Sequence, residues 1–101
     1  MSKKYDWTLE DDFTCCMAYL DFVFNYTGED DLKHLVDVFE EKLPHISRGS
    51  LRMKAQNIKQ IALDAGLEDR LSFSPLANYS VQCKHAFDLA TNALEEQQKR
   101  I

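Results

Sequence analysis

The chain has 101 residues, of which 45% are hydrophobic and 29% charged; this length and balance fit one globular domain. Three glycines and two prolines are too few for an all-β fold with many tight turns. No stretch approaches the roughly 20 apolar residues that a membrane-spanning helix needs, and no apolar segment of a signal peptide follows the first residues. We therefore expect a single cytoplasmic domain without a membrane partner.

The net charge of −5 conceals an uneven distribution. Between residues 5 and 41 there are eleven acidic residues and one basic residue, Lys33, whereas residues 43–63 contain four basic residues and no acidic one. The local field decides whether a phosphate is attracted or repelled. The second stretch is therefore the candidate for contact with nucleic acid, despite the negative total.

A first helix is predicted over about residues 8–25. Thr8 and Asp11 form a pattern like a capping box at its start. Apolar residues follow at helical spacing: Leu9, Phe13, Cys16, Met17, Leu20, Val23 and Phe24. Three aromatic residues, Tyr19, Phe22 and Tyr26, lie off this stripe. They are a candidate protein or homodimer interface, because interface centres are enriched in aromatic residues; alternatively, the last helix buries this second side.

Three further helices are predicted in chain order. The second covers about residues 29–43, starts with acidic residues and stops at Pro44. The third covers about residues 47–65, with Ser47 as its N-cap and Gly66 just beyond its end. The fourth covers about residues 80–98 after an irregular segment. The pattern predicts an all-α, compact four-helix domain.

The third helix has two different faces when its residues are placed about 100° apart. An apolar face collects five residues: Leu51, Ala55, Ile58, Ala62 and Ala65. An adjacent face collects Arg48, Arg52, Gln56 and Lys59, while Lys54 lies at the edge of the apolar arc and would have to snorkel. This basic and amide face either contacts DNA or is a solvated surface that offsets the acidic half of the domain.

Helices one to three resemble the Myb/SANT type of helix-turn-helix. The matching residues are Trp7-Thr8 with Glu10 and Asp11 at the first helix and Ser47-Arg48-Gly49-Ser50 at the third. The chain also resembles the N-terminal helical module of bacterial HNH-type restriction and defence nucleases, through the Trp-Thr start and the run from Ser47 through Met53-Lys54 and Asn57 to Ile58. The resemblance implies a three-helix, helix-turn-helix-like core with a C-terminal helix, a structural tryptophan, and a third helix that reads DNA.

Patterns typical of catalysis or metal binding are missing from the sequence. Three cysteines, Cys15, Cys16 and Cys83, and three histidines fall at no metal-ligand spacing. No zinc-protease, nucleophile-elbow or phosphate-loop motif occurs, and no nuclease domain follows the module. We expect buried, reduced thiols, no cofactor, no metal and no enzymatic activity.

The sequence predicts a non-catalytic DNA-binding module, and the resemblance implies a phage or restriction-defence context. Its candidate contacts with double-stranded DNA are Arg48, Arg52, Gln56 and Lys59, with Lys54 as a further candidate; arginine and glutamine can bind guanine and adenine edges. The alternative is a protein-binding module, or a small acidic inhibitor that imitates the phosphate track of DNA. Its contact residues would be Asp37, Glu40 and Glu41 on the second helix.

Overall fold

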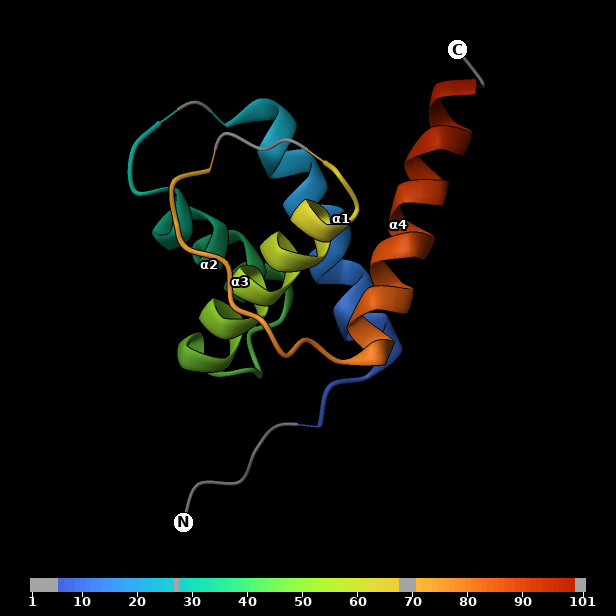
Figure 1. The fold of residues 1–101 in the computed structure, drawn as a ribbon. Coiled ribbons are helices and arrows are strands. Elements are labelled where there is room, and N and C mark those ends of the chain that lie inside the picture. The colour runs from blue at the N-terminus through green and yellow to red at the C-terminus, as the bar shows by residue number, and fades with distance from the viewer. Residues whose placement is uncertain (1–5, 27, 68–70, 100–101) are drawn as a thin grey trace.

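The computed structural model describes residues 6–26, 28–67 and 71–99 and confirms the all-α, four-helix architecture (Figure 1). The helices are α1 (Leu9–Asn25), α2 (Asp31–Lys42), α3 (Arg48–Asp64) and α4 (Val81–Lys99). Each predicted helix is present, with ends within two residues of the prediction. None of the described helices is long and apolar enough to cross a membrane.

Local side-chain chemistry sets where the helices begin and end. Thr8 and Asp11 form a complete capping box at the start of α1, and the hydroxyl of Ser47 caps α3 by accepting from the Ser50 amide. Gly66 follows α3 with φ 81°, a backbone conformation that glycine adopts without steric cost. The second helix begins later than predicted because Asp30 takes a left-handed conformation, with φ 55°.

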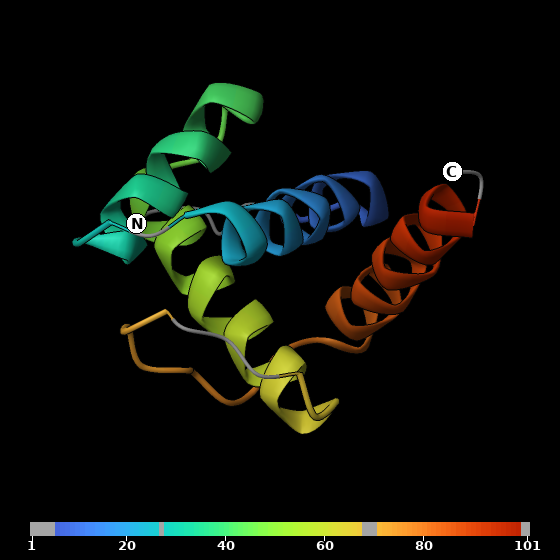
Figure 2. The same ribbon diagram turned by 90° about the horizontal axis from the view of Figure 1, so that it is seen from above.

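Helix α1 lies between α2 and α4, and α3 crosses beneath it (Figure 2). The most extensive packing is between α1 and α4, followed by α2 against α3. The buried core draws on all four helices and on Leu71 and Phe73 of the irregular segment. This segment, residues 71–80, is called the α3–α4 connection below; it runs along α3 before it reaches α4 (Figure 1).

The interface predicted on helix one is wrong for Tyr19 and Phe22. Tyr19 is 0% exposed and Phe22 is also buried, because both belong to the core cluster to which all four helices contribute. Tyr26 is half-buried; its ring stacks on Phe22 with centroids 4.4 Å apart, and its hydroxyl donates to the Glu29 carbonyl. Conversely Phe24, predicted in the buried stripe, is 61% exposed.

The predicted burial of the cysteines is confirmed. Cys15, Cys16 and Cys83 are all buried and form no disulfide. Burial raises the pKa of the Cys15 thiol. The pKa of Cys16 is raised by a hydrogen bond from the Cys16 thiol to Cys83 and, in addition, by burial. A thiol held protonated is a poor nucleophile, so Cys15 and Cys16 act as small apolar core residues.

Candidate nucleic-acid interface on helix α3

Lys54 does not reach the surface, contrary to prediction. Its side chain lies in the interior, with the residue only 6% exposed. The ammonium Nζ is 2.7 Å from Oδ1 of the fully buried Asp12 and 4.3 Å from the centre of the Trp7 ring. The Gln82 amide donates to the other Asp12 oxygen and to the Trp7 carbonyl. Lys54 therefore joins the start of α1 to α3, and is not a DNA contact.

The predicted exposure of Lys59 is also wrong. Lys59 is 7% exposed; its ammonium donates to the Leu71 carbonyl and lies 4.9 Å from the centre of the Phe73 ring. Both partners belong to the α3–α4 connection. The Lys59 ammonium therefore helps to hold the α3–α4 connection against α3, and the connection covers Lys59.

Gln56 is partly covered by the same connection. Its side-chain amide donates to the Ser74 carbonyl over 3.2 Å, and its main-chain carbonyl accepts from the Leu76 amide over 3.1 Å. The amide group that could read a base is therefore engaged in the fold. The C-terminal half of the predicted basic face is accordingly closed by an irregular segment.

Arg48 and Arg52 are the two predicted DNA contacts that remain exposed. The Arg48 guanidinium bridges two acidic residues of α2, with Nη1 2.9 Å from Asp37 Oδ1 and 3.3 Å from Glu40 Oε1. Arg52, one turn further along α3, makes no hydrogen bond or ion pair within the described part of the chain. Arg52 is thus available to an anion, whereas Arg48 would have to break its ion pairs with Asp37 and Glu40 before it could bind one.

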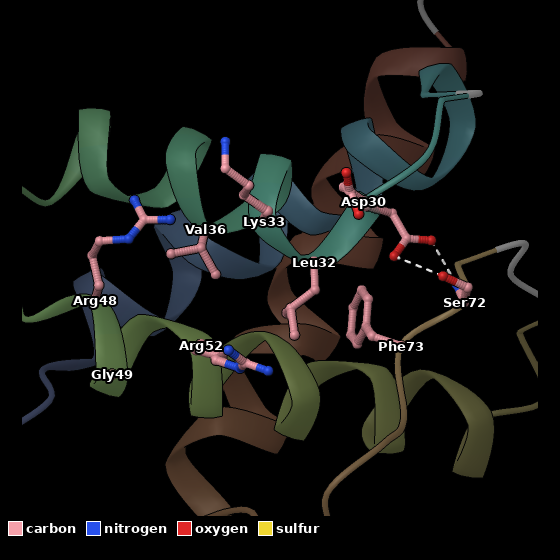
Figure 3. A pocket seen from close by; sticks show the side chains of 10 residues that line it. Asp30, Leu32, Lys33, Val36, Arg48, Gly49, Arg52, Ser72 and Phe73 are labelled. Carbon is pink, nitrogen blue, oxygen red and sulfur yellow. Dashed lines mark hydrogen bonds between the residues drawn. The ribbon is translucent and has the colours of Figure 1, made fainter.

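A groove between α2 and α3 has these arginines on one side (Figure 3). Its floor contains the apolar side chains of Leu32, Val36 and Phe73, and Lys33 stands on the α2 side. Asp31 also lines the groove, but its carboxylate accepts hydrogen bonds from the amide and hydroxyl of Ser72. Three cations and the carboxylates of Asp30 and Asp31 therefore border this groove.

A second groove lies on the opposite flank of α3, toward the start of α4. It is lined by Trp7, Ser50, Met53, Lys54, Asn57, Asn78, Ser80 and Gln82. No carboxylate is among these lining residues, and hydroxyl and amide groups predominate. Oδ1 of Asn57 is buried without a hydrogen-bond partner. The same groove is thus lined by five residues that carry the sequence resemblance: Trp7, Ser50, Met53, Lys54 and Asn57.

Between the two grooves lies an exposed ridge, which we call the α3 strip: Arg48, Gly49, Arg52 and Met53. The whole of α3 carries no acidic residue before Asp64, in a chain with net charge −5. Arginine with neighbouring hydroxyl and amide groups can bind phosphate oxygens and base edges. Because Met53 is 56% exposed, an apolar contact to a thymine methyl group is also within its chemistry.

The candidate acidic interface on α2 is only partly free. Asp37 and Glu40 share Arg48, and Asp37 also lies 3.6 Å from the Lys33 ammonium. Glu41 is exposed and has no ion pair or hydrogen bond among the described residues. Within the described residues, no group of three or more histidine, cysteine or acidic side chains is placed to hold a metal ion.

The Arg48–Asp37 pair predicts a pH-dependent contribution to stability. The hydrogen bond from Arg48 holds the pKa of Asp37 below its ordinary value of 3.8. A carboxyl group with a lowered pKa in the folded state stabilises the fold above its unfolded-state pKa, and this contribution is lost as pH falls through the folded-state value. We expect Arg48→Ala to raise the Asp37 midpoint in an NMR pH titration, and its stability deficit to vanish in acid. Identical midpoints in the two proteins would contradict this ion pair.

The chain matches no protein-family model, no curated protein and no solved structure. Its likeness to Myb/SANT domains and to nuclease modules therefore stays a prediction from short motifs.

Proposed function

We propose that the chain is a non-catalytic DNA-binding module that contacts the duplex through the α3 strip. The observation that carries this proposal is Arg52, an exposed guanidinium that has no acidic partner among the described residues, on a helix whose sequence is free of acidic residues as far as Leu63. The proposed contact set is smaller than the sequence predicted. Lys54, Gln56 and Lys59 are engaged in the fold and are left out of it.

In this proposal the N-terminal half of α3 faces the DNA, as in helix-turn-helix proteins, whose recognition helix contacts bases with its N-terminal residues. Arg52 binds a phosphate or a guanine edge, and uncharged groups of the second groove, such as the side-chain amide of Asn57 and the hydroxyl of Ser80, donate to phosphate oxygens. Arg48 contributes less, because it first has to leave Asp37 and Glu40. Because only two arginines are exposed on the α3 strip, the module alone binds DNA weakly. The proposed place of action is the cytoplasm.

The proposal is tested by fluorescence anisotropy with a labelled duplex of two helical turns at low salt. Loss of one charge-assisted contact costs roughly 1.5–3 kcal/mol, so Arg52→Ala should weaken binding about tenfold or more. Lys84→Ala is the matched control, because it removes one partly exposed cation that is already paired with Asp88 on α4. Equal affinities for the two variants would refute the assignment of α3 as the DNA-contacting element.

A protein-binding module or acidic inhibitor is the second candidate, favoured by the exposed Glu41 beside Asp37 and Glu40, which forms no ion pair with any described residue. In such a protein the same anisotropy titration detects no DNA binding even at low salt. Charge reversal by Glu41→Lys then abolishes inhibition of a nucleic-acid enzyme, while Arg52→Ala has no effect. A phage or restriction-defence context, which the resemblance implies, is compatible with either function.

A further inference from the structure

An apolar groove lies where α1 and α3 end, beside the C-terminal half of α4. Its apolar lining comes from α1, α4 and the turn after α3: Leu20, Phe24, Ala65, Leu67, Phe87 and Leu94. Phe24 is 61% exposed, on a helix most of whose apolar residues are buried. This groove, called the Phe24 groove below, is at the opposite end of α3 from the α3 strip.

We infer that the Phe24 groove binds an amphipathic helix of a partner protein, and that the flanks of this helix are basic. Helices of this kind place apolar residues from successive turns into a hydrophobic groove. Phe24 lines the groove together with Leu67 and Leu94, which are both partly buried. An apolar partner side chain placed among them would cover the exposed ring.

The charges around the groove select a basic partner. The only charged residues that line the groove among the described part of the chain are two carboxylates, Asp88 and Glu95. Asp88 is paired with Lys84 over 2.7 Å, whereas Glu95 has no ion pair or hydrogen bond with the described residues. A lysine or arginine on the partner helix would pair with the Glu95 carboxylate.

The helix ends add to the same negative field. Helices α1 and α3 both end at this groove, and neither has a basic residue in its last turn. The C-terminus of a helix carries a partial negative charge that favours a cation nearby. Two such ends, together with Asp88 and Glu95, repel an acidic partner. The same charges disfavour a second copy of this chain as the partner, because Asp88 and Glu95 of the second copy would then face Asp88 and Glu95 of the first.

The inference is tested with a labelled synthetic helix of leucine and lysine, arranged with leucines on one face. Two control peptides carry the same leucine face with glutamate, and the same composition in scrambled order. We expect the ordered leucine–lysine peptide to bind at least about tenfold more tightly than either control. Phe24→Ser should remove most of this preference, and the conservative Phe24→Leu should retain it. Circular dichroism confirms that both variants fold, as expected for a change at an exposed site.

A pair of charge reversals distinguishes the groove from general attraction between opposite charges. Glu95→Lys, in the groove, should weaken peptide binding several-fold, whereas Glu41→Lys, on α2, should leave it unchanged. Equal effects of these two variants, or full binding by Phe24→Ser, would overturn the inference. So would a wild-type dimer that Phe24→Ser dissociates, since a second copy would then occupy the groove. Arg52→Ala should bind the peptide normally, so failure here leaves the DNA proposal separately testable.

Discussion

Replacing Lys54 with methionine should lower the free energy of unfolding by about 3–5 kcal/mol, the cost of removing one partner from a buried ion pair. Methionine keeps most of the aliphatic stem, but it leaves the carboxylate of Asp12 in the interior without its cation. The favourable contact between the ammonium and the Trp7 ring is lost at the same time. Urea denaturation measures the change.

Two further variants separate the ion pair from other effects at this position. The double change Asp12→Asn with Lys54→Met removes both charges and keeps a side-chain oxygen for Gln82, so we expect it to recover much of the lost stability. Arg52→Met, on the exposed side of the same helix, should change stability by no more than about 0.5 kcal/mol. If Lys54→Met proved as mild as Arg52→Met, Lys54 would not be the buried partner of Asp12.

Truncation of Tyr19 to alanine is the second large expected effect. Tyr19 is fully buried between α1 and its neighbours, and removal of a large core aromatic side chain typically costs about 3–5 kcal/mol. Phe24→Ala, five residues along the same helix, removes a side chain that is mostly in solvent and should cost far less. Thermal or urea denaturation of the two variants compares them directly. The opposite ranking would show that Tyr19, and not Phe24, faces outward.

The helices were predictable from the sequence because their signals are local. Capping residues such as Thr8 and Ser47, apolar residues at helical spacing, Pro44 and Gly66 act within one or two turns of the chain. The boundary of α2 was missed by two residues, since the left-handed conformation of Asp30 leaves no clear trace in the residue pattern. The aromatic residues of α1 were misplaced because a helical wheel does not show how wide an arc the neighbouring helices cover.

The candidate site was less predictable, since its shape depends on contacts between distant segments. A wheel places Lys59 beside Arg52, but only the tertiary structure shows that Leu71 and Phe73 of an irregular connection cover it. For the burial of Lys54, the sequence contains one usable signal. Lys54 borders the apolar arc of its helix and Asp12 lies near the apolar stripe of another, so their opposite charges suggest a pair. No pattern in the sequence predicts that Asn57 and Trp7 line the same groove.

The salt dependence of DNA binding tests the proposed contact surface most directly. The slope of log K against log salt falls by about 0.9 for each phosphate that a protein cation neutralises. Arg52→Ala should therefore make the slope shallower by about one, while Lys59→Met, which keeps its aliphatic stem against Phe73, should leave it unchanged. A slope that responds to Lys59 and not to Arg52 would contradict the account, and so would wild-type protein that binds no duplex at low salt.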